Sequence, residues 1–394
     1  MLVIIRQSIR EIKTLTQASR SARIVVTEGV GPDIYSRMIK YLGSKRTLIP
    51  LILEVIRRAG PARTVMDPFS GTVRVGHALK ADGYRVLAGD VNAYAATLAR
   101  CYVQADREEV ADDAARLVRE FNALPGRPGY FTETFCERAR FFQPRNGARV
   151  DAIRTAIAAK SLPPELEAVM LVSLMEAADR VDSTAGVQMA YLKAWSARSY
   201  QDLVLRVPDV LPQAAAGHGE AHQLDAMDFA RRFDADIAYL DPPYNQHSYL
   251  GNYHIWESLV RWDQPEVYGV ACKRRDCRDR PSVFNSRPRF AGAFRELLSA
   301  LRAGTLIVSF SNEGFLTRAE MESLLSSLWD GRAHVFTIVR DYKRYVGAQI
   351  GIFNPRGEKV GRVSHLRNTE FLFVVSRSEI SGRFEELTTA RTRR

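Results

Sequence analysis

Apolar residues recur at helical spacing from Thr47 to Arg58, and Gly60-Pro61 ends the helix that this spacing predicts. The segments after it alternate between short apolar runs and helical periodicity. They are Thr64–Met66 (strand), Val73–Ala81 (helix), Arg85–Ala88 (strand) and a helix that runs to about Tyr102. Strand and helix alternating over about 40 residues are typical of a parallel α/β sheet.

The alternation then stops for more than 100 residues. The pattern of residues 105–222 is mostly helical, with predicted helices at Val150–Ala159, Pro164–Ala178 and Met189–Ser196. It resumes with a strand at Ile237–Leu240. The later predicted elements are a helix at Tyr253–Trp262, a loop at Gly269–Arg289, a helix at Phe290–Leu301, a strand at Thr305–Phe310, a helix at Arg318–Leu328, and strands at His334–Val339 and Glu370–Val375.

These patterns predict the α/β fold class, with one sheet domain assembled from residues 38–104 and 223–378. Residues 105–222 are expected to form a helical inserted subdomain. Residues 1–37 are polar without a sustained period and are interpreted as an N-terminal extension, so translation could start at Met1 or at Met38. Residues 379–394 are interpreted as a C-terminal tail.

The composition is that of a globular protein. Of 394 residues, 46% are hydrophobic and 26% charged, which excludes a disordered or fibrous chain. No apolar run approaches the roughly 18–20 residues that span a bilayer, so we expect no membrane partner. Four cysteines are too few for a disulfide scaffold, which favours a reduced, cytoplasmic setting.

The charge is strongly basic and the basic residues are mostly arginine. The formal net charge is +11, and 47 of the 56 basic residues are arginine. Arginine suits planar, bidentate contacts to phosphate and guanine, although genome composition alone can also enrich it. Nucleic acid is therefore a candidate partner.

The tetrapeptide Asp241-Pro242-Pro243-Tyr244 follows the predicted strand Ile237–Leu240. Ligands of open α/β sheets bind at the carboxyl ends of strands. Because proline has no N–H, the proline carbonyls and the Asp241 carboxylate present only acceptors, and the tyrosine adds a flat face for stacking. This set suits an exocyclic amino group on a planar base; a plain proline turn after a strand is the alternative.

Two earlier strand ends carry further candidate groups. In Asp67-Pro-Phe-Ser-Gly-Thr72, the glycine Gly71 would let the backbone approach a ligand closely. The spacing lacks the G-x-G-x-x-G of dinucleotide-binding enzymes, which argues against NAD. Asp90 ends the next strand, where an acidic side chain typically binds ribose hydroxyls; capping of the following helix is the alternative.

The loop Gly269–Arg289 is dense in basic residues with few apolar anchors. Arginine and asparagine contact phosphates and base edges, so we expect nucleic-acid contacts here, with solvated surface as the alternative. Cys272 and Cys277 lack a second cysteine pair, so no metal site is predicted. The residues expected to contact DNA are Lys273, Arg274, Arg275, Arg278, Arg280, Arg287 and Arg289.

Together these segments resemble the Dam-like class of adenine-specific DNA methyltransferases. That family carries K-[WY]-x-G-x-K, a D-P-F-x-G-x-G-like loop, an acidic strand end, a variable insert and D-P-P-Y. The matching segments are Lys40–Arg46, Asp67–Gly76, Asp90 and Asp241–Tyr244. One departure is the second glycine of the loop, which comes later here, at Gly76.

The resemblance implies a Rossmann-like S-adenosylmethionine-dependent methyltransferase sheet, with residues 105–222 as a candidate target-recognition subdomain. It implies methyl transfer from S-adenosyl-L-methionine to the N6 amino group of adenine, within a specific sequence of double-stranded DNA and with base flipping. The implied catalytic residues are Asp241, Pro242, Pro243 and Tyr244. The implied cofactor-binding residues are Tyr41, Lys45, Asp67, Phe69, Gly71, Asp90, Asp228 and Asp241.

Two helical-looking stretches, Arg140-Phe-Phe-Gln and Ala190–Trp195, resemble the type II modification branch, which makes a cognate restriction endonuclease a candidate partner. Three alternatives stay open: methylation of cytosine N4 in DNA, methylation of adenine in RNA, and a nucleic-acid-binding protein without catalysis. D-P-P-Y favours adenine, because the cytosine enzymes more often carry serine in place of the aspartate.

Because the resemblance begins at Met38, deletion of residues 1–37 is expected to leave methyl transfer largely unchanged. The measurement compares the methylation rate and the cofactor affinity of the truncated and full-length proteins. A truncated protein that is insoluble or does not bind the cofactor would show instead that the extension belongs to the core.

Overall fold

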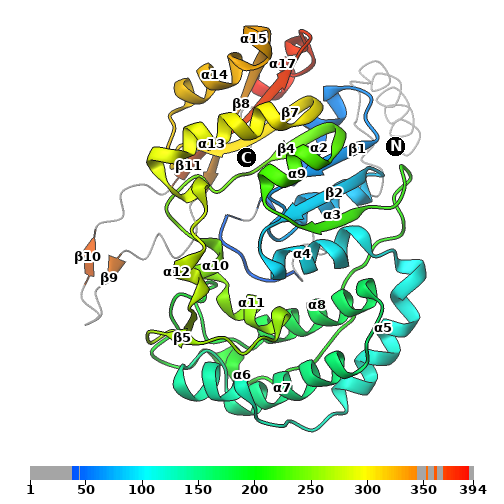
Figure 1. Ribbon diagram of the computed structural model, residues 1–394, viewed down its shortest axis with the longest axis vertical. Helices are drawn as coiled ribbons and strands as arrows, with labels where there is room; N and C mark the ends of the chain where they lie inside the picture. Colours follow the sequence, from blue (N-terminus) through cyan, green and yellow to red (C-terminus); the bar gives the residue numbers. More distant parts are fainter. Residues whose placement is uncertain (1–37, 44, 344–351, 354–358, 362–366, 390–394) are drawn as a thin grey trace, which may run out of the picture. The chain divides into compact units, whose positions relative to one another are not determined.

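The predicted strands on both sides of the helical segment join, together with one further strand, into one sheet with the order β3-β2-β1-β4-β7-β11-β8 (Figure 1). Strands β3 to β7 of this order are parallel, and β11 is antiparallel to both of its neighbours. This arrangement confirms the predicted Rossmann-like α/β sheet. Its strands are β1 (Thr64–Asp67), β2 (Arg85–Asp90), β3 (Glu220–Gln223), β4 (Asp234–Leu240), β7 (Arg302–Ser311), β8 (His334–Lys343) and β11 (Arg367–Ser376).

Alternate residues of the strands point to opposite faces of the sheet, and helices cover and bury both faces. Val65, Ile237 and Ile307 belong to one hydrophobic core, together with helices α2, α3 and α4. Met66 and Ala238, each one residue further along its strand, belong to a second core with helices α9, α13 and α14. These six helices are α2 (Ile49–Ala59), α3 (Arg74–Ala81), α4 (Ala93–Ala99), α9 (Ala226–Arg232), α13 (Arg287–Ala300) and α14 (Arg318–Ser326).

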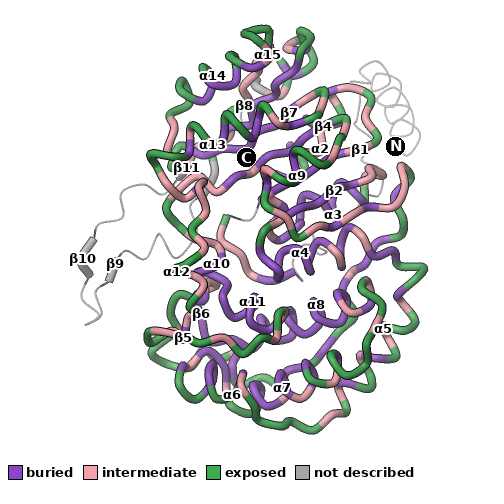
Figure 2. Tube along the Cα trace, in the orientation of Figure 1, coloured by how far each residue is buried: buried purple, intermediate pink, exposed green. Residues whose placement is uncertain are grey.

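The segment between β2 and β3 supplies a layer of helices against the first of these cores. Helix α8 is apolar around its circumference and is buried along nearly its whole length (Figure 2). A helix that is apolar on all sides has to be surrounded, and α5, α7 and α11 lie beside it. The helices that this segment supplies are α5 (Arg107–Asn122), α6 (Tyr130–Thr132), α7 (Pro144–Ala159) and α8 (Pro164–Arg180), and α11 (His254–Arg261), which follows β4, completes the layer.

Two details of the expected insert are wrong. Met189–Ser196 is not helical; Thr184 and Tyr191 instead form an antiparallel bridge, and Gln188 is fixed by hydrogen bonds to Asn252 and His254. The segment assigned as helical also ends in an edge strand, since β3 begins at Glu220. The division into a sheet domain and an insert stays a prediction.

The remaining elements are short or lie near the C-terminus. They are α10 (Tyr249–Asn252), β5 (Val267–Tyr268), β6 (Lys273–Arg274), α12 (Asp276–Asp279), α15 (Leu328–Gly331), β9 (Ile352–Phe353), β10 (Lys359–Gly361) and α17 (Glu385–Thr389). Two of them, β6 and α12, lie in the predicted loop at 269–289, so part of that loop forms secondary structure.

The computed structural model describes residues 38–389 except residue 44 and residues 344–351, 354–358 and 362–366. The extension at 1–37, with the truncation prediction, lies outside the described residues, as do residues 390–394 of the predicted tail. Among the described helices, none combines the length and the apolar character needed to cross a bilayer.

Candidate active site

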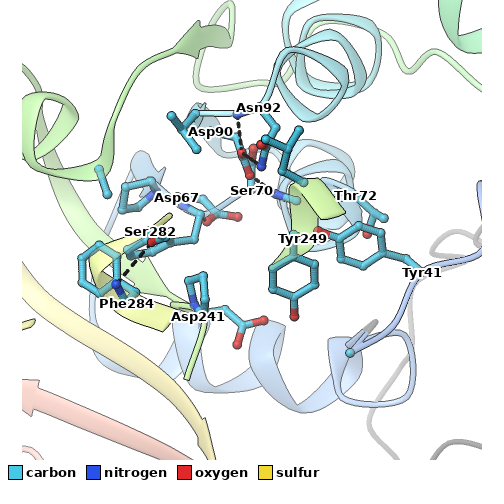
Figure 3. Close-up of a pocket in the computed structure, with 18 of the residues that line it drawn as sticks. Tyr41, Asp67, Ser70, Thr72, Asp90, Asn92, Asp241, Tyr249, Ser282 and Phe284 are labelled. Carbon is cyan, nitrogen blue, oxygen red and sulfur yellow. Dashed lines mark hydrogen bonds between the residues drawn. The ribbon is translucent and has the colours of Figure 1, made fainter. Parts of the chain in front are cut away.

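The parallel register brings three aspartates to one edge of the sheet. Asp67 ends β1, Asp90 ends β2 and Asp241 follows β4, and these strands pair as neighbours in parallel. The strand order reverses between β1 and β4, where open α/β sheets form their ligand crevice. Figure 3 shows the three carboxylates around a pocket, with Tyr41 and Tyr249 on one side of it and Phe284 on the other.

Most of the predicted cofactor residues line this pocket. The predicted residues found there are Tyr41, Lys45, Asp67, Phe69, Gly71, Asp90, Asp241, Pro243 and Arg280. Pro242 and Tyr244 lie beside the lining residues; the ring of Tyr244 is 5.7 Å from Lys45 Nζ and packs on Phe310.

The loops after β1 and β2 are tied together by backbone hydrogen bonds. The Asp90 carboxylate accepts from Gly71 N at 3.1 Å and from Asn92 N at 2.9 Å, and Ser70 N donates to Gly89 O. The Asp67 carboxylate accepts from Phe69 N at 3.1 Å. Both carboxylates are thus fixed in place by the backbone of the loop that they border.

The departure of this loop from the family pattern has a clear geometry. Gly71 has a φ of +50°, and a Cβ there would lie 3.3 Å from the Tyr41 hydroxyl. Val73 stands where the pattern D-P-F-x-G-x-G places its second glycine, and its φ of 58° and ψ of 15° are left-handed. For a β-branched residue this conformation is strained. A Cβ on Gly76 would lie 3.0 Å from Val73 Cγ2, so the later glycine makes room for the valine.

Burial and mutual repulsion make the pocket favour positive charge. Burial, with the Asp241 and Asp90 charges, raises the pKa of Asp67 well above its usual range. Burial likewise raises the pKa of Asp90 to about 6, although the hydrogen bonds from Asn92 and Gly71 oppose the rise. Carboxylates held this way are stabilised by a cationic ligand or by hydroxyl donors.

Lys45 is the cation closest to the D-P-P-Y carboxylate. Its Nζ is 3.2 Å from Asp241 Oδ1 and 3.2 Å from Glu370 Oε2. Burial opposes the charge of this ammonium, but Asp241, Tyr244 and Glu370 raise the pKa of Lys45 well above its usual range. Burial raises the pKa of Asp241, and the Lys45 charge counteracts that rise.

Tyr41 lines one side of the pocket as part of a cluster of stacked tyrosines, the tyrosine wall. Its ring stacks on Tyr253 at a centroid distance of 4.5 Å and on Tyr249 at 5.2 Å. The Tyr41 hydroxyl is 3.4 Å from that of Tyr94. Tyr249 and Tyr253 come from α10 and its C-terminal end, so the segment after D-P-P-Y packs directly on the N-terminal basic turn.

Asp228 does not belong to the pocket. Its side chain is 69% exposed and lies 3.9 Å from Arg231. Asp225 and Ala226 line the pocket instead, and the Asp225 carboxylate caps α9 by accepting from Met227 N at 2.8 Å. Asp228 therefore lies apart from the other predicted cofactor residues, and Asp225, about one helical turn earlier, occupies the pocket lining in its place.

Arg280 belongs to the pocket wall and not only to the basic surface. It donates to Val91 O at 3.4 Å, next to Asp90, and lies 3.8 Å from the buried Glu257. Glu257 accepts in turn from Tyr94 N at 3.1 Å, at the start of α4. Local sequence pattern does not reveal the role of Glu257, because Tyr94, whose backbone it accepts from, lies 163 residues away along the chain.

The prediction that Arg274 contacts DNA is wrong. The residue is 2% exposed and donates to both Asp263 oxygens, at 2.6 and 2.7 Å, and to both Asp276 oxygens, at 3.0 and 3.1 Å. It also reaches Ser258 Oγ of α11 at 3.3 Å. Arg274 therefore anchors the basic loop to the helical layer. Of the other predicted DNA contacts, Arg275, Arg278, Arg287 and Arg289 are exposed and Lys273 is half-buried.

No metal-binding arrangement is found in the part of the chain that the structure describes: no three His, Cys, Asp or Glu side chains gather there. Cys272 is buried, and Cys277 is half-buried with its thiol directed at Leu250 O at 3.9 Å.

Replacement of Arg274 by methionine is expected to lower the free energy of unfolding by about 2 kcal/mol, because Asp263 and Asp276 each lose a hydrogen-bonded partner. The partial exposure of the two carboxylates limits this cost. Urea unfolding gives the measurement. The matched control is Arg275→Met, in which an exposed arginine of the same loop is changed, with an expected effect within about 0.5 kcal/mol. Equal effects of the two variants would contradict the anchoring role.

Comparison with known proteins gives consistent matches. The family model of the D12 class N6 adenine-specific DNA methyltransferases matches residues 41–304. Type II methyltransferase M.FokI of Planomicrobium okeanokoites is 30% identical over 330 residues, covering 78% of this chain and 50% of that protein. Type II methyltransferase M.NlaIII of Neisseria lactamica is 26% identical over 349 residues, covering 85% of this chain and 98% of that protein.

Modification methylase StsI of Streptococcus sanguinis is 26% identical over 306 residues, covering 73% of this chain and 46% of that protein. The chain thus spans about half the length of M.FokI and StsI and nearly all of M.NlaIII. The match of the family model runs from the tyrosine wall past D-P-P-Y and takes in most of the pocket. The chain belongs to the D12 class of N6 adenine-specific DNA methyltransferases.

Proposed function

We propose that this protein transfers the methyl group of S-adenosyl-L-methionine to the N6 amino group of adenine within a specific sequence of double-stranded DNA. The observation that carries the proposal is the Asp241 carboxylate, which borders the pocket between Lys45 and the stacked tyrosines. Family membership supports the reaction class and the target atom.

The residues of the pocket fit such a cofactor. The left-handed Gly71 leaves open space that a Cβ would fill, and the Asp90 carboxylate borders it as an acceptor for ribose hydroxyls. The surplus of buried carboxylates suits a sulfonium cation. Tyr41, Phe69 and Asp225 complete the set of groups that would hold it. The bound cofactor supplies an electrophilic methyl group.

The chain's own residues act on the target base. The amino nitrogen of adenine is a poor nucleophile because its lone pair is delocalised into the ring. Asp241 and the Pro242 carbonyl accept hydrogen bonds from its two N–H groups, which favours a pyramidal nitrogen. The nitrogen gains the methyl group and then releases one proton, and the Asp241 charge stabilises the positive charge that develops on it. The Tyr244 ring stacks on the base once it leaves the duplex.

Exposed basic residues of the 269–289 loop are proposed to hold DNA phosphates. Arg278 lies 3.7 Å from the centre of the Tyr268 ring, and Arg275 pairs with Glu266 at 2.9 Å at the surface. Arg287 and Arg289 stand at the exposed start of α13. Together with Lys273 they form the basic surface of a loop whose residues Arg280 and Phe284 line the pocket, and this charge suits a polyanion.

Two further parts of the proposal concern partners and location. Residues 105–222 contribute to target recognition. The relatives named as type II methyltransferases and modification methylases support a cognate restriction endonuclease as partner. The protein then acts on DNA in the cytoplasm.

Asp241→Asn is expected to lower the methylation rate at least 100-fold, because the charged acceptor at the amino group is lost. The assay incubates duplex DNA with labelled S-adenosyl-L-methionine and identifies the modified nucleoside by mass spectrometry. Duplex binding and thermal stability should stay near those of the wild type. The matched control is the exposed Asp228→Asn, with activity expected within twofold.

Three results would count against this function. They are activity of Asp241→Asn within a few-fold of the wild type, methylation found at cytosine N4, and methylation confined to RNA. A wild-type protein that binds DNA and cofactor without any transfer would favour a binding protein without catalysis.

A further inference from the structure

Glu370 is a buried acid that lies outside the 41–304 segment matched by the family model. It sits on β11, opposite Ser311 of β7 and Arg340 of β8, and is 7% exposed. A buried carboxylate needs a charged or hydrogen-bonding partner. Its partner is Lys45, whose Nζ lies 3.2 Å from Glu370 Oε2.

Lys45 is shared by two carboxylates that differ in access to the pocket. The side chains of Lys45 and Glu370 are 6% and 8% exposed, whereas that of Asp241 is 22% exposed. Asp241 also lines the pocket, which Glu370 does not. The row Asp241–Lys45–Glu370 therefore has one open end, at Asp241, and a formal charge of −1.

A simple ion pair of Asp241 with Lys45 would weaken the acid as an acceptor. The ammonium would then concentrate its charge on the carboxylate that has to accept hydrogens from a neutral amino group. Glu370 draws part of that charge away, at the same N···O distance of 3.2 Å. It also leaves the site with surplus negative charge, which favours a cationic methyl donor.

We propose that Glu370 is a positioning residue for methyl transfer, which shares the Lys45 ammonium with Asp241 and so keeps the Asp241 carboxylate available to the target amino group. This inference rests on the proposed function, because it assigns Asp241 the role of acceptor. Glu370 acts through Lys45 and does not touch the pocket itself.

Several other ionisable groups act on this row. They are Asp67 of β1, Tyr239 of β4, Tyr244, Tyr249 of α10, and Glu313 after β7. The tyrosines stay neutral near pH 7, since burial raises the pKa of each further above its usual range near 10. The ionisation of Asp241 is therefore set by the charges of Lys45, Glu370 and the neighbouring acids.

The sign of the effect follows from these charges. Burial raises the pKa of Asp241, and Lys45 lowers it. In Glu370→Gln, Lys45 acts on Asp241 alone and one nearby negative charge is gone, so the pKa of Asp241 should fall. Asp241 then stays ionised to lower pH but is a weaker acceptor. The variant should therefore be slower on its plateau, and the acidic limb of its pH–rate profile should shift to lower pH.

The experiment uses the full-length protein and three variants: Glu370→Gln, Glu370→Asp and, as control, Glu322→Gln. Glu322 is a glutamate of α14 that pairs with Arg318 and Thr337 away from the pocket. Single-turnover methylation is measured from pH 5 to pH 9. In parallel, the Asp241 carboxyl carbon is titrated by NMR in cofactor-free protein labelled with ¹³C at aspartate, with Asp241→Asn identifying the signal.

Glu370→Gln is expected to lower the single-turnover rate about tenfold, less than removal of the acceptor itself, with the KM for DNA unchanged within about twofold. The pH–rate limb and the NMR titration should both move to lower pH. Glu370→Asp, which retains the charge, should recover part of the rate. Glu322→Gln should match the wild type in both measurements.

Two outcomes would overturn the proposal: an unchanged rate in Glu370→Gln, or a lower rate with an unshifted Asp241 titration and a lower melting temperature, which indicates a merely structural role. If the wild-type protein transfers no methyl group, the proposed function fails. The NMR titration in cofactor-free protein then still decides whether Glu370 competes for Lys45.

Discussion

The site depends on the parallel register of β2, β1 and β4, which gathers three carboxylates at one edge of the sheet. Carboxylates that border one pocket repel each other, and burial adds to the free-energy cost of keeping them ionised. Backbone N–H groups of the loops offset part of that cost at Asp67 and Asp90, and Lys45 does so at Asp241. The negative charge that is not offset makes the pocket favour a cation. This preference follows from the order of the strands and not from any single motif.

The 269–289 loop connects this pocket to the basic surface. Arg274 holds the loop on α11, and Asn285 donates to Asn245 O at 2.7 Å and to His247 O at 3.1 Å, just after D-P-P-Y. Arg280 and Phe284 of the same loop line the pocket. The loop is therefore tied to the helical layer on one side and to the segment after D-P-P-Y on the other, and the part between these anchors forms part of the pocket wall.

Sequence reasoning found the parts of the site that are local and missed those that depend on distant pairing. The aspartates at strand ends could be predicted because a short apolar run marks each strand and parallel strands share an edge. Glu370 could not, since its contact with Lys45 spans 325 residues and depends on where β11 inserts between β7 and β8. The adjacent arginines Arg274 and Arg275 cannot be told apart in the sequence, because only their contacts in the folded protein make one buried and the other exposed.

Local pattern also fails where a few tertiary contacts outweigh it. The segment Met189–Ser196 has helical spacing, yet hydrogen bonds between Gln188 and the residues Asn252 and His254 hold it in a non-helical path. The loop after β1 gives a second case. Val73 is fully buried in a left-handed conformation that glycine would adopt without strain, while Gly76 leaves the space that the valine fills. A glycine at 73 alone would leave that space empty, and a side chain at 76 alone would collide with the valine. The two positions therefore act as one unit: the valine at 73 requires a residue without a side chain at 76, so the second glycine comes three residues later than in the family pattern.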